Sequence, residues 1–344
     1  MSTPLSILDL APIAPGETAR DSFAASVALA QTAERTGYRR VWYAEHHNMP
    51  TIASSATSIL IGHVAGQTST IRLGSGGIML PNHAPLTIAE QFGTLASLYP
   101  DRIDLGLGRA PGSDQETMRA MRRDPMSADR FPEDVLELQA YLAGQSRVPG
   151  VQATPGAGTN VPLYILGSSL FGAQLAAMLG LPYAFASHFS PDALHEAVGV
   201  YRRDFKPSAQ LAEPYVLAGV NVIAATDAED AREQFAVTRR ARVRGMLQRG
   251  PAGTEYSDEQ VDAFLSTPSG RGIANMMRYS VAGTPDEVRD FLENFAAKAH
   301  ADELIIAHAS QNIGDRLRSV ELTAEAMHDA RQGARQGEMQ GAVA

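Results

Sequence analysis

Short apolar runs alternate with longer amphipathic runs along almost the whole chain, and this alternation restricts the possible folds more than any other feature. Eight of the apolar runs have the length and composition of β-strands, and they cover residues 5–9, 39–45, 71–80, 102–108, 162–168, 183–188, 214–224 and 302–308. Strands that are separated by helices form parallel βαβ units. Eight such units close a (β/α)8 barrel, whereas a doubly wound sheet usually has five or six strands.

Helical patterns fill the intervals between these runs. The first pattern begins at Asp21 and ends at Gly37, a residue suited to the left-handed conformation that terminates many helices. The other patterns cover residues 54–66, 85–98, 113–123, 131–144, 170–180, 191–205, 228–244, 285–299 and 315–330. No glycine-rich dinucleotide fingerprint follows Asp9, which disfavours a Rossmann-type sheet. We therefore predict an α/β fold, a single (β/α)8 TIM barrel domain over residues 1–331.

Three stretches depart from the regular alternation. Residues 144–160 are rich in Gly and Pro and predict a long loop. Residues 248–278 predict an insertion before the last strand, and long insertions in barrels are often lids over the active face. Residues 332–344 contain too few apolar side chains to pack, so we expect a disordered tail.

The composition excludes several classes of function. The chain has 344 residues, 44% of them hydrophobic, and it contains no cysteine, which excludes disulfides, thiolate zinc sites, iron–sulfur clusters and cysteine nucleophiles. The formal net charge of −9 argues against nucleic-acid binding, and an anionic ligand would need a local cluster of donors. Neither a signal-peptide pattern nor an apolar run of membrane-spanning length is present, so we expect a cytoplasmic protein without membrane contact.

The run "VWYAEHHN" places Glu45, His46 and His47 at the end of the second predicted strand. The active site of a parallel barrel lies at the carboxyl ends of its strands. A metal site is disfavoured because successive strand residues point to opposite faces and the spacing is neither HxH nor HExxH. A structural or solvated histidine pair stays open, but we favour a catalytic histidine that acts as general acid or base. His83 and His188 also lie near strand ends and could line a pocket.

The third predicted strand contains "GSGGIMLP", in which residues 74–77 have almost no side chain. A flat ligand could approach this bare backbone closely, or the glycines could mark a bulge or tight bend where a Cβ would clash. The Gly76–Gly77 bond is also a place where a cis peptide between non-proline residues meets little steric resistance.

Donors for an anion follow the fourth and fifth predicted strands. Arg109 stands just past the fourth strand, where it could pair with a phosphate or with Asp101 or Asp104. Ser168 and Ser169 precede a predicted helix, whose first N–H groups could bind an anion or be capped by the serine hydroxyls. Arg109 and the two serines together predict a phosphate clamp on an otherwise acidic protein.

The chain resembles the bacterial-luciferase-like flavin-dependent monooxygenases, specifically their non-luminescent branch. The resemblance covers residues 5–330 and rests on the ordered motifs "VWYAEHHN", "GSGGIMLP", "RIDLGLGRAPGSD", "PLYILGSSLFGAQLAAMLGLP" and "SVAGTPDEV". It implies a luciferase-like (β/α)8 barrel that binds reduced FMN supplied by a separate, transiently bound flavin reductase. It also implies that O2, as co-substrate, reacts with this flavin to form a C4a-peroxyflavin, which then oxygenates a small organic substrate.

The resemblance further implies roles for individual residues. His46 corresponds to the catalytic histidine of the family, and the Gly76–Gly77 bond to its non-proline cis peptide near the isoalloxazine ring. Arg109 corresponds to the arginine on the FMN phosphate, and Ser168 and Ser169 to positions that contact the same group.

Three positions depart from the luciferase catalytic subunit, and the first is Ser168, which replaces an acidic residue of that subunit. Gly172 stands where that subunit has a phosphate-binding threonine, so only the backbone of Gly172 could contribute to cofactor binding. Gly108 stands where that subunit has a reactive cysteine, so flavin lifetime and substrate access are expected to differ, and light emission does not follow from the resemblance.

The resemblance also suggests a homodimer formed through the helices after the second and third strands. Ile59, Leu60, Phe92 and Leu95 would then face the partner, unless they pack against the barrel. Two other functions stay open: an oxidoreductase that uses the deazaflavin F420, and a non-catalytic protein that sequesters flavin. His46 favours catalysis over storage, because binding alone needs no titrating base.

Overall fold

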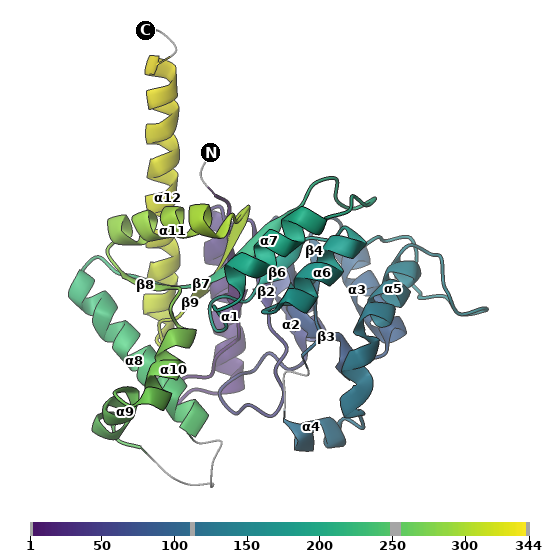
Figure 1. Ribbon diagram of the computed structural model, residues 1–344, viewed down its shortest axis with the longest axis horizontal. Helices are drawn as coiled ribbons and strands as arrows, with labels where there is room; N and C mark the ends of the chain where they lie inside the picture. Colours follow the sequence, from purple (N-terminus) through teal and green to yellow (C-terminus); the bar gives the residue numbers. More distant parts are fainter. Residues whose placement is uncertain (1–2, 111–113, 248–255, 342–344) are drawn as a thin grey trace.

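The computed structural model of the chain is a closed barrel of eight parallel strands surrounded by helices (Figure 1). It describes residues 3–110, 114–247 and 256–341. The barrel strands are β1 (Leu5–Asp9), β2 (Arg40–Tyr43), β3 (Arg72–Met79), β4 (Ile103–Gly108), β5 (Leu163–Gly167), β6 (Tyr183–Phe185), β7 (Val216–Ala224) and β9 (Glu303–His308). The sheet closes because β9 pairs with both β7 and β1, and β6 pairs with β7. The predicted TIM barrel is confirmed.

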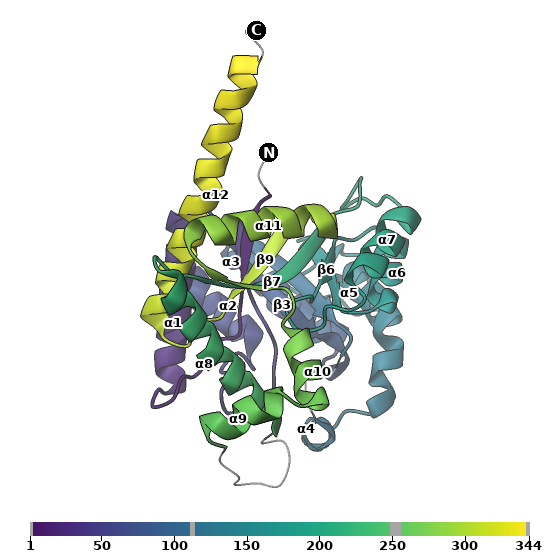
Figure 2. The same ribbon diagram turned by 60° about the vertical axis from the view of Figure 1, so that its left-hand side comes forward.

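The helices lie outside the barrel and cover its strands (Figures 1 and 2). Local sequence explains several of their ends. α1 begins after a capping box formed by Thr18 and Asp21, and α6 ends at Gly180, whose φ of 64° is left-handed. The helices are α1 (Ala19–Arg35), α2 (Thr57–Ala65), α3 (Pro85–Leu98), α4 (Gln115–Ala120), α5 (Phe131–Leu142), α6 (Leu170–Leu179), α7 (Leu194–Asp204), α8 (Ala228–Leu247), α9 (Asp258–Leu265), α10 (Pro268–Met276), α11 (Pro285–Ala299) and α12 (Ile313–Gly341), with short 3-10 turns η1 (Leu80–Asn82) and η2 (Pro125–Arg130).

A further strand, β8 (Ser280–Gly283), pairs with the carboxyl half of β7 and was not predicted. β6 pairs only with residues 216–218 of β7, whereas β8 pairs with residues 221–224. β8 therefore lies beside β7 beyond the end of β6 and outside the closed barrel. Three of its four residues are only partly buried, and Val281 is its only large apolar side chain, so the sequence carried no apolar run there.

The described part of the predicted insertion forms α9 and α10, and residues 248–255 lie outside the described residues. These two helices lie with α4 at the end of the molecule opposite the amino terminus (Figures 1 and 2). Because β1 starts beside the amino terminus and the barrel strands are parallel, this is the end at which the strands finish. The insertion thus stands at the carboxyl end of the barrel.

Of two other segments, one agrees with its prediction and one does not. Residues 144–160 form turns and extended loop, as predicted. α12 continues to Gly341 and so includes most of the segment for which we expected a disordered tail, while residues 342–344 lie outside the described residues. Within the described ranges, no helix has both the length and the apolar character needed to cross a membrane.

The side chains that we expected at a dimer interface are mostly internal. Leu60, Phe92 and Leu95 are buried in the main core of the chain, where they pack with the outer faces of the strands. Ile59 is 74% exposed on α2, and Leu98 is 64% exposed at the end of α3. Three of the four side chains therefore pack against the barrel, which was the alternative to a dimer contact.

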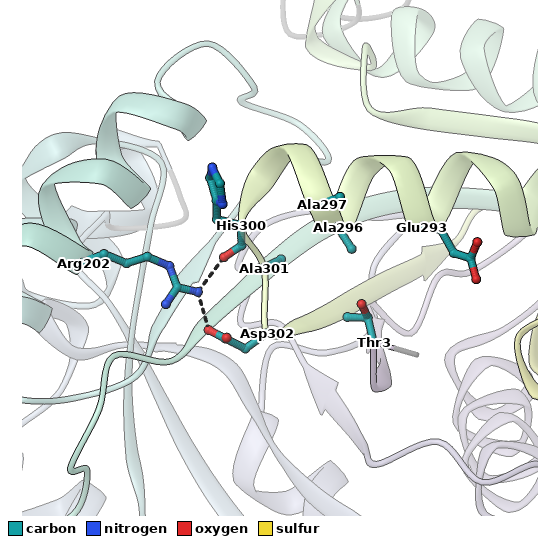
Figure 3. Close-up of a pocket in the computed structure, with 8 residues that line it drawn as sticks. All are labelled: Thr3, Arg202, Glu293, Ala296, Ala297, His300, Ala301 and Asp302. Carbon is teal, nitrogen blue, oxygen red and sulfur yellow. Dashed lines mark hydrogen bonds and ion pairs between the residues drawn. The ribbon is translucent and has the colours of Figure 1, made fainter. Parts of the chain in front are cut away.

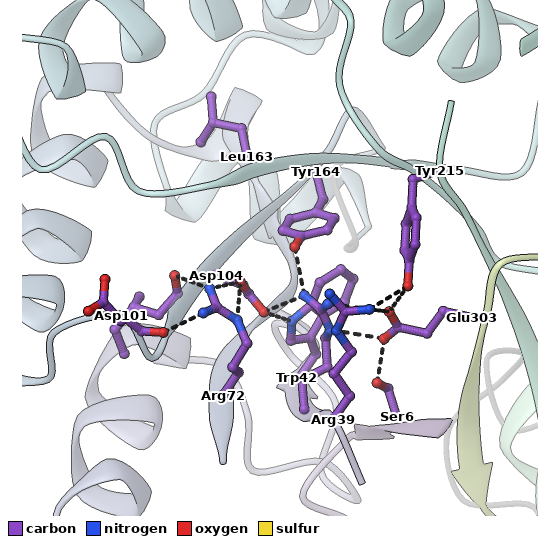
Figure 4. Close-up of polar contacts among 12 residues, drawn as sticks. Ser6, Arg39, Trp42, Arg72, Asp101, Asp104, Leu163, Tyr164, Tyr215 and Glu303 are labelled. Atoms are coloured by element: carbon purple, nitrogen blue, oxygen red, sulfur yellow. Dashed lines mark hydrogen bonds and ion pairs between the residues drawn. The ribbon is translucent and has the colours of Figure 1, made fainter. Parts of the chain in front are cut away.

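A buried cluster of charged and aromatic side chains closes the amino end of the barrel interior (Figure 4). Arg40 Nη1 donates a hydrogen bond to Asp104 Oδ2 at 2.7 Å, and Arg40 Nε lies 2.9 Å from Glu303 Oε1. The rings of Trp42 and Tyr164 lie 5.6 Å and 5.1 Å from the guanidinium carbon. These contacts connect β2, β4, β5 and β9, so one end of the barrel is filled.

Candidate functional site

The carboxyl end of the barrel interior is lined by small residues. Gly76, Ser168, Ala186 and Ala307 continue the interior-facing series of their strands, and all four are partly exposed. The layer beneath them is an apolar cluster around Trp42 that is buried. The barrel is therefore open at the end where barrels of this kind hold their active sites.

Glu45 is the buried anchor of the loop that follows β2. Its Oε1 accepts a hydrogen bond from His47 Nε2 at 2.8 Å, and His83 Nε2 lies 2.9 Å and 3.0 Å from its two oxygens. Its Oε2 also accepts from the backbone N–H of Met79 at 3.0 Å. Burial by itself would raise the pKa of Glu45, but these hydrogen bonds lower it to about 2. The ionised carboxylate therefore ties this loop to the end of β3.

The two histidines of the run have different surroundings. His47 is partly exposed, and its hydrogen bond to the buried Glu45 raises its pKa. His46 is partly exposed and interacts electrostatically with His188, which follows β6 on another side of the barrel. Burial, with smaller electrostatic contributions from Arg242 and His46, lowers the pKa of His188 to about 3, so His188 is neutral near pH 7. The structural interpretation therefore fits His47, whereas His46 interacts with a residue that follows a different strand.

The Gly76–Gly77 peptide bond is cis and lies at an irregularity in the pairing of β3 with β4. A Cβ atom on Gly76 would lie 2.6 Å from Leu8 Cδ1, and one on Gly77 would lie 2.8 Å from the carbonyl oxygen of Gly106. Close packing inside the barrel therefore already requires both glycines, as the bulge interpretation expected. Gly76 remains partly exposed, so its backbone also borders the open end.

Arg109 follows β4 and extends over the first turn of α6. Its guanidinium carbon lies 4.2 Å from the centre of the Phe171 ring, close enough for a cation–π contact. The alternative partner Asp104 is instead bound by Arg40 and Arg72. Arg109 itself is exposed, so its guanidinium can meet a ligand at the rim.

The start of α6 has the features of an anion site. Ser169 is the N-cap residue, but its side chain makes no capping hydrogen bond, and the first turn contains no acidic residue. Tyr183 Oη donates to the Ser169 carbonyl oxygen at 3.0 Å, which fixes the backbone at this point. Ser169 is exposed and Ser168 partly exposed, whereas Gly172 is buried, since a Cβ there would lie 3.3 Å from the Tyr183 ring. The structure thus brings Ser168, Ser169 and Arg109 to one part of the rim.

Three further residues belong to this end of the barrel: His83 and His188, which the sequence offered only as possible pocket residues, and Arg242, which it did not offer. His83 and His188 follow strand ends, and that position was the only signal they carried. Arg242 lies within α8, and its Nη1 stands 3.5 Å from the carbonyl oxygen of His188. An arginine in the middle of a helix has no local pattern that marks it as a site residue, so the sequence alone could not have identified it.

A hollow of about 650 Å³ lies at the amino end of the barrel, away from all these residues (Figure 3). Its lining includes Thr3, His300 and the ion pair between Arg202 and Asp302, whose N and O atoms are 2.7 Å apart. We assign it no function, because its charged pair is already satisfied and parallel barrels react at the other end. Among the described residues, no group of three or more His, Cys, Asp or Glu is arranged to hold a metal ion.

Comparison with known proteins gives a consistent result along the chain. The family model described as luciferase-like monooxygenase matches residues 3–303. A "Luciferase-like monooxygenase" of Escherichia coli K12 is 49% identical over 94% of this chain and 97% of its own length. The "N-acetyl-S-alkylcysteine monooxygenase" of Bacillus subtilis is 32% identical over 95% of this chain and 99% of its own length.

Solved structures agree with this fold. Apo-MsnO8 superimposes with a TM-score of 0.84 at 36% identity, covering 95% of this chain and 98% of its own. The oxygenating constituent of 3,6-diketocamphane monooxygenase from Pseudomonas putida, in complex with FMN, has a TM-score of 0.70 at 16% identity, with 94% and 97% coverage. An F420-dependent secondary alcohol dehydrogenase has a TM-score of 0.69 at 16% identity, with 95% and 98% coverage. At 16% identity the last two matches show a shared fold alone.

Proposed function

Because the chain belongs to the luciferase-like monooxygenase family, we propose that it is a flavin-dependent monooxygenase that uses reduced FMN and O2 to oxygenate a small organic substrate. The observation that carries the proposal is the position of Arg109 over the first turn of α6. His46 and the cis Gly76–Gly77 bond border the same open end of the barrel. These features suit a flat ring in the barrel mouth and a phosphate at the rim.

The residues at the rim fit a phosphate. Arg109 supplies charge-assisted hydrogen bonds, and the uncapped first turn of α6 supplies backbone N–H donors and the positive end of a helix dipole. The Ser168 and Ser169 hydroxyls add two neutral donors, and the backbone of Gly172 completes the turn. This local cluster allows a protein of net charge −9 to hold a dianion.

We assign the proton transfer of the reaction to the imidazole of His46. An imidazole is the side chain whose ordinary pKa suits proton exchange at neutral pH. Glu45 positions the loop that carries His46 by binding His47, His83 and the backbone of Met79. Reduced flavin, when bound, supplies the electrons with which one oxygen atom of O2 is transferred to substrate.

Isotope transfer tests the proposed activity. Reduced FMN is supplied by a separate flavin reductase and NADH under ¹⁸O2, with N-acetyl-S-alkylcysteines as first substrates, because a relative of 32% identity carries that activity in its name. We expect product that is heavier by one ¹⁸O atom and only in the presence of the protein. Product formed with reduced F420 and without O2 would instead establish the F420-dependent alternative. Saturable FMN binding without turnover of any substrate would favour the sequestering protein.

The remaining parts of the proposal concern partners and location. We propose that the reductase interacts only transiently, that the protein is cytoplasmic, and that it forms a homodimer. The exposed Ile59 and Leu98 on α2 and α3 support the homodimer, because they are large apolar side chains on the helices that the family resemblance implicates. Analytical ultracentrifugation tests it, and a sedimentation mass of 36.7 kDa at micromolar concentration would contradict it.

A further inference from the structure

We propose that Arg242 of α8 binds a carboxylate of the substrate at the mouth of the barrel. The proposal rests on the proposed function in one respect, because it identifies the bound anion as the molecule to be oxygenated. It adds a substrate class, namely organic acids, and a residue that selects it.

The position of Arg242 is set by the end of β6. Its Nη1 lies 3.5 Å from the carbonyl oxygen of His188, and the Nδ2 atom of Asn221 donates to that same oxygen at 2.7 Å. Asn221 lies on β7 and also donates to Ser280 of β8. The guanidinium is thus fixed where β6, β7 and β8 meet at the carboxyl end of the barrel, next to a histidine that interacts with His46.

Arg242 differs from its neighbours on the same helix. Arg240 and Arg244 form ion pairs with Asp262 and Asp258 of α9, with Arg240 Nη2 only 2.5 Å from Asp262 Oδ2. A helix turns about 200° over two residues, so Arg242 projects from the opposite side of α8. Within the described parts of the chain, Arg242 has no carboxylate partner.

The acidic side chains near this end of the barrel are occupied elsewhere. Glu45 is bound by His47 and His83, and Asp114 accepts hydrogen bonds from Asn48 and from the start of α4. Asp192, which follows β6, pairs with Arg278 at 3.5 Å. The described residues therefore leave the counter-ion of Arg242 to be supplied by a ligand.

The energetics also favour a ligand for this arginine. Burial lowers the pKa of Arg242, although a guanidinium stays charged at any physiological pH. A cation withdrawn from water without a counter-ion destabilises a fold, so such a residue is expected to serve a bound anion. The carboxylate geometry matches the planar fork of an arginine, which can donate two parallel hydrogen bonds.

The site is separate from the proposed phosphate clamp. Arg109 follows β4 and lies against α6, whereas Arg242 lies on α8 and contacts the loop after β6. His188 adds no second cation near pH 7, because its pKa is about 3. A phosphate at one part of the rim and a carboxylate at the other can therefore be bound together, with His46 at the same open end.

Binding of matched ligand pairs tests the inference. Hexanoate, benzoate and N-acetyl-S-methylcysteine are each compared with their neutral amides by titration against the full-length protein, with and without saturating oxidised FMN. We expect at least one carboxylate to bind about tenfold or more tightly than its amide. R242M should lose this preference and R242K should keep part of it. R232M is the matched control, because Arg232 is on the same helix but its side chain is 66% exposed and 4.0 Å from Glu287.

Two outcomes would overturn the inference: a wild-type protein that shows no carboxylate preference in any pair, and an R242M variant that keeps the preference. Thermal stability gives a second readout, because R242M without ligand should melt at or above the wild-type temperature if the charge is uncompensated. A variant that melts far below wild type, or fails to fold, would make Arg242 a structural residue. FMN affinity is measured in the same samples, so loss of the carboxylate preference is distinguished from failure of the protein to bind flavin at all.

Discussion

At the scale of single residues, adjacent histidines have separate roles because one buried carboxylate binds only one of them. Glu45 holds His47 at 2.8 Å and leaves His46 on the other side of the chain. The arginines also have separate partners: Arg40 and Arg72 bind Asp104 at the amino end, whereas Arg109 lies over Phe171 of α6 at the other end of β4. The side chains proposed to meet a ligand at this rim are therefore those that the buried carboxylates do not bind.

Replacing His46 by alanine should lower turnover by about 100-fold or more while FMN affinity stays within a few fold. In the proposed mechanism the imidazole moves a proton and is not needed to hold the phosphate. Steady-state oxygenation and flavin titration measure the two quantities separately. H63A is a matched control, since His63 is exposed on α2. Full activity in H46A would remove this residue from the mechanism.

Replacing Arg109 by alanine should weaken FMN binding by about 2 to 3 kcal/mol, since a charge-assisted contact with phosphate is lost. Riboflavin, which has no phosphate, should bind the variant nearly as well as the wild type. Fluorescence titration with both flavins provides the measurement. Equal losses for both ligands would mean that Arg109 contacts the ring or acts through Phe171 instead.

At the scale of elements, the candidate site is assembled by contacts between segments that follow different strands. Glu45 joins the loop after β2 to the end of β3 and, through His83, to the residue after η1. This contact sets the relative position of His46 and the Gly76–Gly77 segment. Its strength depends on pH, because both partners of the Glu45–His47 pair titrate.

Replacing Glu45 by glutamine should flatten the pH dependence of stability. The pKa of Glu45 falls from 4.5 to about 2 on folding, so its stabilisation, on the order of 3 kcal/mol, is present above pH 4.5 and is lost as pH falls toward 2. The pKa of His47 is raised above 6.5 on folding. Its contribution to the free energy of unfolding is therefore present below pH 6.5 and is lost as pH rises through the raised value. Urea unfolding from pH 2 to pH 8 measures both the acid loss that belongs to Glu45 and the loss near neutral pH that belongs to His47. The exposed variant E196Q should keep the wild-type profile, and an unchanged profile in E45Q would disprove the assignment.

The elements themselves were largely predictable, because a strand buried on both faces leaves a continuous apolar run in the sequence. All eight barrel strands were found in this way, and α11 was predicted with the same bounds, 285–299, because Thr284 and Pro285 mark its start. β8 was missed because it is only partly buried and lacks an apolar run, and α9 and α10 were missed because the insertion has the composition of polar surface.

The candidate site was predictable only where position after a strand carries information. His46, Arg109, Ser168 and Ser169 follow strand ends, and parallel topology brings such residues to one rim. His83 contacts Glu45 from 38 residues further along the chain, and the contact between Arg242 and His188 spans 54 residues. Contacts of this kind depend on three-dimensional packing, which a single sequence does not encode as a local pattern.

At the scale of the whole molecule, the barrel has one filled end and one open end. The buried cluster at the amino end contains Arg40 and two fully buried carboxylates, Asp104 and Glu303. Small residues line the opposite end, where the candidate site lies. The buried ion pairs and the candidate site therefore lie at opposite ends of the same strands, so the proposed ligand contacts do not use the buried cluster.

Replacing Arg40 by methionine should destabilise the whole barrel by about 3 to 5 kcal/mol, because two buried carboxylates lose their shared cation. Arg40 contacts side chains of β4, β5 and β9, so the loss should appear as a lower midpoint of a single cooperative unfolding transition with an unchanged slope. Trp42 is the only tryptophan of the chain and lies 5.6 Å from this guanidinium, so its fluorescence reports on the cluster directly. R39M is the matched control: Arg39 also approaches Glu303, at 3.7 Å, but its side chain is 48% exposed, so the loss should stay below about 1 kcal/mol. Equal losses of stability in R40M and R39M would show that burial of the Arg40 ion pairs contributes nothing. The amino end of the barrel would then have no special part in stability.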